Sequence, residues 1–255
     1  MSPTETLQRF FNAFVHYEEQ AIADLFPGPV AIDTPLSGAI DGADALGAAL
    51  EQEGHWWREH LREIRPLTSL ETGHWLVGEL EVDLHHEGRH FDLPVALVGQ
   101  KCPGGLGQIR LYHSTWPLSG RHTYRAPIVW PGHREEEPQV IARYFEALDQ
   151  GDAGQALELF APDAYAREPS GSAYRHEGAQ ELKRFYEKAL SDGGIRLTHS
   201  TTAFDGRLFA VEFICDGWGS TTFDPMAGCA CYELTDDQQF IRAVRIYDDV
   251  TPPSE

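Results

Sequence analysis

Apolar residues recur at helical spacing in three stretches of the second half of the chain. The first stretch has them at positions i, i+3, i+4 and i+7: Ile141, Tyr144, Phe145 and Leu148. We expect this helix to end at Gly151, because glycine readily takes the left-handed conformation of a helix C-cap. Residues 156–160 and 178–190 predict two further helices. Between them, residues 164–168 predict a short strand, since the following Pro169 disfavours helix at the residue before it.

After the third helix the apolar residues alternate with polar ones, which is typical of strands. Four stretches show this alternation: residues 195–204, 208–218, 226–234 and 240–247. Residues 235–238 provide the predicted hairpin between the last two. Helices followed by a run of strands predict an α+β fold, in which three helices pack on a curved, mainly antiparallel sheet.

The first half of the chain follows the same plan. Its pattern predicts two helices within 6–26, a short strand at 31–35, a long helix at 44–62 and strands at 75–84, 90–100 and 107–116. The run RFFNA that begins at Arg9 matches RYFEA at Arg143, 134 positions later. The run IRLYH at Ile109 matches VRIYD at Val244, 135 positions later. Several matches at nearly one offset indicate a repeat of domain length.

The repeat predicts a tandem arrangement of two domains. We expect a first domain at 1–118, a linker at 119–138 and a second domain at 139–255. The linker contains several prolines and the charge run Arg134-Glu135-Glu136-Glu137, and it shows no sustained period.

Net charge and cysteine spacing limit the partners and the cellular location that we expect. The chain carries 40 acidic and 20 basic residues, a net charge of −20, so phosphate backbones and anionic lipid surfaces would repel it. We therefore expect neither nucleic-acid nor membrane partners. The N-terminus lacks the basic and apolar regions of a secretory signal. The four cysteines form no C-x-x-C pair, which favours free thiols and a cytoplasmic location.

Both halves resemble the NTF2-like, SnoaL-like superfamily of cone-shaped α+β domains. That superfamily includes ketosteroid isomerases, limonene-epoxide-hydrolase-like enzymes and polyketide cyclases. The resemblance is carried by YFEALDQGD from Tyr144, by Glu168-Pro169 and by Phe185-Tyr186. It implies that Tyr144 donates a hydrogen bond to a developing oxyanion, that Glu168 moves a proton, and that Tyr186 supports Tyr144.

The chain departs from the family patterns at several positions. Where ketosteroid isomerases place a second, protonated acid, the chain has Cys229 and Cys231. The Arg and Asp of the epoxide-hydrolase pattern correspond to Ile214 and Asp216 in the second half. In the first half Phe10, Thr34 and Leu50 occupy the three site positions, so we expect a degenerate site there.

We expect the Glu168 carboxylate to lie in an apolar cone facing Tyr144, because desolvation raises a carboxyl pKa and makes it a usable base near neutral pH. Further candidates for the substrate pocket come from equivalent strand positions of both halves: Glu212, Asp216, Tyr247, Asp33, Glu79 and His113. We expect no metal site and no organic cofactor.

The resemblance implies a SnoaL-like isomerase or cyclase that uses cofactor-independent acid–base chemistry on an apolar, polyketide- or terpenoid-like substrate. Two alternatives stay open: a non-catalytic small-molecule-binding or scaffold protein, and an epoxide-hydrolase-like enzyme. NTF2-like domains commonly pair through their sheets. We therefore expect a monomer that contains an intramolecular pseudo-dimer, with a homodimer as the alternative.

Overall fold

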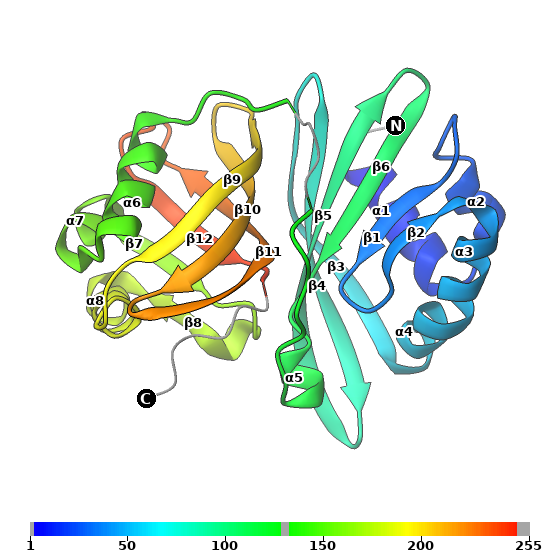
Figure 1. Cartoon of the computed structure of the whole chain (residues 1–255), viewed down its shortest axis with the longest axis horizontal. Coiled ribbons are helices and arrows are strands. Elements are labelled where there is room, and N and C mark those ends of the chain that lie inside the picture. Colours follow the sequence, from blue (N-terminus) through cyan, green and yellow to red (C-terminus); the bar gives the residue numbers. More distant parts are fainter. Residues whose placement is uncertain (1–2, 129–132, 249–255) are drawn as a thin grey trace. The chain divides into compact units, whose positions relative to one another are not determined.

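The computed structural model of the chain describes residues 3–128 and 133–248. It divides into two compact units, Met1–Arg121 and His122–Glu255. Each unit contains one six-stranded sheet with helices on one face (Figure 1). The predicted α+β class and the tandem arrangement are therefore confirmed. Among the described residues, no helix has the length and apolar character needed to cross a membrane.

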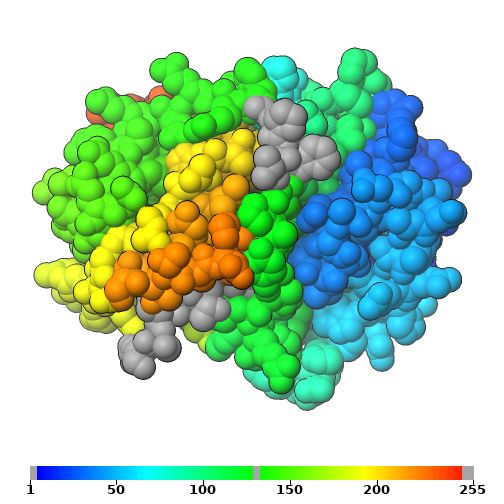
Figure 2. All heavy atoms as spheres, in the orientation of Figure 1, coloured from blue at the N-terminus to red at the C-terminus, as the bar shows by residue number. Residues whose placement is uncertain are grey.

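The first unit begins with helices and ends with strands, apart from a short final helix. In chain order it contains α1 (Pro3–Val15), α2 (Glu19–Ala23), β1 (Ala31–Thr34), β2 (Gly38–Asp41), α3 (Gly42–Ala49), a π-helical turn η1 (Leu50–Gly54), α4 (His55–His60), β3 (Leu61–Glu71), β4 (Trp75–His86), β5 (Arg89–Cys102), β6 (Gly105–Tyr112) and α5 (Trp116–Ser119). The strand order is β2-β1-β6-β5-β4-β3. All neighbours are antiparallel except β1 and β6, which are parallel. In Figure 2 the atoms of α3 and α4, in light blue, cover the side of this unit that faces away from its sheet.

The second unit repeats this order. It contains α6 (Gln139–Gln150), α7 (Ala153–Glu158), β7 (Phe160–Arg167), the short 3-10 helix η2 (Ser172–Tyr174), β8 (Arg175–Glu177), α8 (Gly178–Ala189), β9 (Ile195–Phe204), β10 (Leu208–Trp218), β11 (Thr221–Leu234) and β12 (Ile241–Ile246). Its strand order, β8-β7-β12-β11-β10-β9, is that of the first sheet, with β7 and β12 as the parallel pair. The two halves of the chain thus share a strand topology as well as a sequence repeat.

The helix α6 illustrates how the sequence pattern produces the packing. Its buried residues form the apolar stripe that the period predicts: Val140, Ile141, Tyr144, Ala147 and Leu148. The helix ends at Gly151, whose φ of 70° lies in the left-handed region. A Cβ at this position would come within 2.8 Å of the backbone of Gly193. Glycine therefore serves both the helix end and the close approach of the loop after α8.

Three strands are not anticipated by the sequence pattern. The strands β2 and β8 are short return strands that pair with β1 and β7. The strand β3 contains Pro66 and has two irregularities in its pairing with β4, so its alternation is interrupted. The predicted long helix at 44–62 is continuous up to His60 but contains the π-helical turn.

Residues 122–128 and 133–137 contain several groups that bond to strands of the second unit. Thr202 Oγ1 donates to the Glu135 carbonyl at 2.7 Å, and the His199 ring lies 2.7 Å from the Glu137 carboxylate. The Ala227 N–H donates to the Arg125 carbonyl at 3.0 Å. Arg125, Glu135 and Glu137 of the segment expected as a linker are therefore anchored on β9 and β11.

Candidate active site

The hairpin of β7 and β8 determines where Glu168 lies. Ala164 and Ala166 of β7 are buried in the core under the helices. Because side chains alternate along a strand, Glu168 falls on the same side as these alanines. Its N–H donates to the carbonyl of Tyr174, the last residue of η2, at 3.1 Å, which ties the end of β7 to the turn before β8. Pro169 follows, and a proline disfavours the helical conformation at the residue before it, here Glu168.

The partner of Glu168 is His176, which the sequence pattern did not reveal. The register pairs His176 with Ala166, so both side chains are on the helix side of the hairpin. His176 Nε2 lies 2.7 Å from Glu168 Oε1. An ionised carboxylate only accepts hydrogen bonds, so Nε2 is the donor. We call this pair the Glu168–His176 dyad.

The dyad is partly open to solvent. The Glu168 side chain is 36% exposed and that of His176 is 28% exposed. The expectation of a dry carboxylate is therefore wrong: Glu168 is partly exposed, and its hydrogen-bond partner is the imidazole of His176. The physical reason is the short strand β8, which brings His176 beside Glu168.

A pair of buried tyrosines lies deeper in the same unit. The hydroxyl oxygens of Tyr144 and Tyr186 are 2.8 Å apart, and both side chains are almost fully buried. Burial raises the pKa of both phenols, so they stay protonated near neutral pH. One O–H serves the bond between them, which leaves the other O–H able to donate to an acceptor. The structure thus brings together two of the three predicted catalytic residues.

Phe185 connects the dyad to the phenols. Its ring stacks on that of His176 with centroids 4.5 Å apart and an interplanar angle of 18°. It also contacts the adjacent Tyr186 ring, edge to face, at 5.0 Å. The dyad and the phenol pair are therefore neighbours of one aromatic side chain on α8.

Aromatic rings fill the interior around Tyr144. Phe145, Phe160 and Tyr232 each contact its ring at centroid distances of 5.6 to 5.9 Å. Burial also raises the pKa of Tyr232. The Tyr232 side chain comes from β11, between Cys229 and Cys231 on one side and the last hairpin on the other. A phenol thus reaches the core next to the positions where the family pattern would place an acid.

Three predicted pocket residues of the second unit lie elsewhere. Glu212 occupies the opposite face of its strand from Val211 and Phe213, which are in the core. Ile246 packs against the core, so its neighbour Tyr247 lies on the opposite face of the sheet. Asp216 is about half exposed and forms an ion pair with Arg196 at 3.2 Å.

In the first unit, Asp33 and Glu79 also lie on the opposite face from core residues of their strands, and Glu79 accepts a hydrogen bond from Thr68. His113 is on the helix side. Its ring meets that of Trp57 edge to face with centroids 5.4 Å apart.

A buried carboxylate in the first unit was also missed. Glu53 lies in the π-helical turn and is 2% exposed. Its Oε2 accepts hydrogen bonds from Thr34 Oγ1 at 2.6 Å and from Ser37 Oγ at 2.8 Å. Its Oε1 accepts from Trp57 Nε1 at 3.3 Å. Thr34 holds the position equivalent to Glu168, so in this unit the carboxylate comes from the helix and not from the strand.

No group of three or more His, Cys, Asp or Glu side chains suited to a metal ion occurs in the part of the chain that the structure describes. All four cysteines are free thiols. Burial raises the pKa of the Cys215 thiol to about 12, so it stays protonated.

Part of the second unit matches a known protein family. Residues 141–243 match the family described as SnoaL-like domain. A putative polyketide cyclase from Sinorhizobium meliloti is similar at 22% identity, over 43% of this chain and 94% of that chain, with a TM-score of 0.37.

Two further solved structures are similar over a comparable part of the chain. The epoxide hydrolase/cyclase-like enzyme SalBIII matches at 17% identity, over 43% of this chain and 87% of that chain, with a TM-score of 0.37. A protein of unknown function with a cystatin-like fold from Methylobium petroleophilum PM1 matches at 20% identity, over 46% and 77%, with a TM-score of 0.36.

The order and pairing of the strands define two α+β domains of one topology in tandem. Within the second unit, the match to the SnoaL-like domain runs from the first turn of α6 into β12, over residues 141–243. The resemblance that the sequence indicated is therefore confirmed for that half of the chain.

Proposed function

We propose that the second unit is an acid–base catalyst that transfers a proton on a small, largely apolar organic molecule, in the manner of an isomerase or cyclase. The observation that carries this proposal is the 2.7 Å hydrogen bond of the Glu168–His176 dyad on the helix side of the hairpin. A carboxylate at a partly open rim is accessible to a ligand, and the imidazole fixes its orientation.

In the proposed reaction Glu168 removes a proton from a carbon next to a carbonyl. His176 Nε2–H donates to Oε1, so Oε2 is the oxygen that takes the proton. The electron pair of the broken C–H bond moves to the carbonyl oxygen, and the free O–H of the Tyr144–Tyr186 pair donates to that oxyanion. In a substrate with a β,γ double bond, the electron pair on the oxyanion re-forms the carbonyl, the double bond shifts to the α,β position, and the protonated Glu168 gives its proton to the γ carbon, which completes an isomerisation.

The test measures exchange of α-protons for deuterium in 2-tetralone, an apolar cyclic ketone, by proton NMR. We expect Glu168→Gln to slow the enzyme-dependent exchange by about 10²- to 10⁴-fold, the usual range for a general base. Glu177→Gln is the matched control, because Glu177 lies on the same hairpin but is 62% exposed and pairs with Arg175. Equal rates for wild type and Glu168→Gln would contradict the proposal.

A non-catalytic binding or scaffold role is the second candidate. It is favoured by the rings that pack around Tyr144, because a filled interior leaves less room for a substrate beside the phenols. In that case 2-tetralone shifts NMR signals of the second unit, or leaves them unchanged, without any enzyme-dependent exchange.

A further inference from the structure

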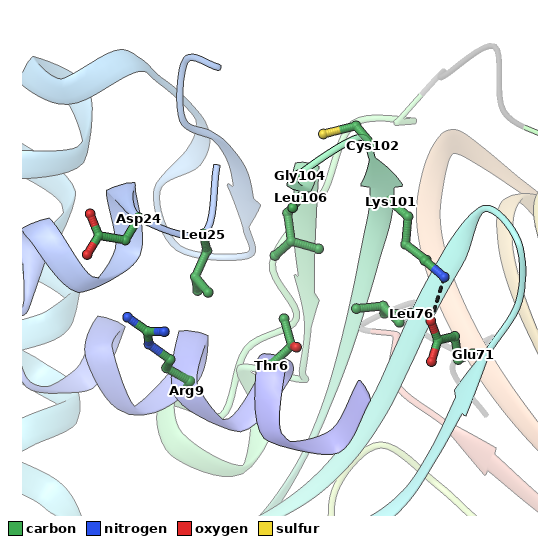
Figure 3. A pocket seen from close by; sticks show the side chains of 11 residues that line it. Thr6, Arg9, Asp24, Leu25, Glu71, Leu76, Lys101, Cys102, Gly104 and Leu106 are labelled. Atoms are coloured by element: carbon green, nitrogen blue, oxygen red, sulfur yellow. Dashed lines mark hydrogen bonds and ion pairs between the residues drawn. The ribbon is translucent and has the colours of Figure 1, made fainter. Parts of the chain in front are cut away.

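A pocket of about 300 Å³ lies in the first unit and shares no residue with the clusters described above. Its walls come from the start of α1, the segment after α2 and the ends of strands β3 to β6 (Figure 3). It lies at the start of β6, whereas Thr34 is toward the other end of that strand, since Ile32 of β1 pairs in parallel with Ile109. The pocket is thus at the opposite end of the unit from the Glu53 carboxylate.

A backbone hydrogen bond fixes the apolar wall of the pocket. Leu25, Leu76 and Leu106 contribute its apolar side chains. The Leu106 N–H donates to the Leu25 carbonyl at 2.8 Å. A Cβ at Gly105 would come within 2.3 Å of that same carbonyl oxygen, so this approach requires glycine. The wall is therefore fixed in the folded state, which suits a preformed ligand site.

The second unit provides an internal comparison, because its hairpins correspond to those of the first. Glu71 pairs with Leu76 across β3 and β4, and Phe204 pairs with Phe209 at the same place in β9 and β10. The two phenylalanine rings contact each other with centroids 6.4 Å apart. The first unit thus has a carboxylate and a leucine where the second has two aromatic rings. Glutamate and leucine occupy less volume than two phenylalanine rings, which favours an open pocket in the first unit.

The charged side chains of the pocket differ in whether they already have a partner. Lys101 forms an ion pair with Glu71 at 2.5 Å, and Asp24 accepts a hydrogen bond from Gln20 at 2.8 Å. Arg9 is exposed and lines the pocket from α1, as Figure 3 shows. Among the described residues no hydrogen bond, ion pair or ring contact involves its guanidinium. Arg9 is therefore the cation that is available to a ligand.

We propose that this pocket binds a small organic anion, a monocarboxylate with a hydrocarbon body. The carboxylate pairs with the Arg9 guanidinium, whose planar fork fits two carboxylate oxygens. The hydrocarbon lies against the three leucines and leaves water. The volume is at the lower end of the range for small-molecule sites, which limits the ligand to a compact molecule. This site is independent of the proton transfer proposed for the second unit.

The probe is octanoate, titrated into the full chain at low salt and followed by the amide NMR signals of Leu25, Gly105 and Leu106. We expect saturable shifts of these signals and a Kd raised about tenfold or more by Arg9→Gln, because a charge-assisted hydrogen bond is lost. Arg143→Gln is the matched control, since Arg143 is the repeat equivalent of Arg9 on α6. It should leave the Kd within about twofold of wild type.

Three further measurements separate the contributions of pocket volume, pocket charge and ligand charge to octanoate binding. Leu76→Phe copies Phe209 of the second unit and should abolish octanoate binding by filling the pocket. Asp24→Asn should tighten binding, because it removes a negative charge from the pocket wall. Octan-1-ol, which has the same chain without the charge, should bind more weakly than octanoate. The proposal is overturned if octanoate gives no saturable shift, if Arg9→Gln leaves the Kd unchanged, or if octan-1-ol binds as tightly.

Discussion

The three tyrosines inside the second unit show how burial sets chemistry at the scale of one residue. Tyr144, Tyr186 and Tyr232 all have a pKa raised by desolvation, from an ordinary value of 10.0. A phenol that stays protonated near neutral pH keeps its O–H as a hydrogen-bond donor. In the proposed reaction the roles of donor and base therefore belong to different residues, the phenols and the Glu168–His176 dyad.

This burial predicts the behaviour of the protein at high pH. Because the folded state holds the three phenols above their unfolded pKa, their contribution to stability is full below pH 10 and is lost as the pH rises toward the folded pKa. Absorbance at 295 nm should therefore show at least three of the nine tyrosines un-ionised at pH 11.5 while the fold persists. Complete titration near pH 10 with an unchanged circular dichroism spectrum would contradict this.

Glu53 predicts a large effect on the stability of the first unit. Glu53→Ala leaves the donors of Thr34, Ser37 and Trp57 without their acceptor, so we expect a loss of about 2–4 kcal/mol in the free energy of unfolding. Glu51→Gln is the control, since Glu51 is exposed in the same turn. Urea denaturation measures both variants. A Glu53→Ala protein within about 0.5 kcal/mol of wild type would show that the cluster does not stabilise the unit.

At the scale of elements, the sequence predicts the long periodic stretches and misses the short or interrupted ones. The stripe of α6 and the strands β9 and β10 follow directly from spacing. The strand β8 has three residues, too few for a period to be visible. His176 could not be placed beside Glu168 without it. Glu53 was missed because an acid within a helical stretch reads as part of the solvated face.

The turn after α6 gives a prediction at this scale. Gly151→Ala should destabilise the second unit by about 2–4 kcal/mol, since the new Cβ meets the Gly193 backbone at 2.8 Å and the φ of 70° is unfavourable for alanine. Gly178→Ala is the matched control: its φ is 78°, but a Cβ there meets nothing within 4 Å. It should cost about 1–2 kcal/mol. Thermal unfolding compares them, and equal losses would show that the contact contributes nothing.

At the scale of the whole molecule, one topology occurs twice with different side chains at corresponding positions. The strand orders are the same in the two units. The end of the first short strand carries Thr34 in one unit and Glu168 in the other. The first unit keeps a carboxylate at this end through Glu53, and it has an open pocket at the other end. The duplication was visible in the sequence, whereas this division depends on contacts between residues far apart in the chain.

The central claim is that the dyad and the phenol pair act on one bound molecule. It is tested most directly by α-proton exchange of 2-tetralone in Glu168→Gln, Tyr144→Phe and the double variant. Residues that act in one step are not additive, so the double variant should lose little more activity than the slower single variant. Losses that multiply, or a Tyr144→Phe protein with the wild-type rate, would contradict the account.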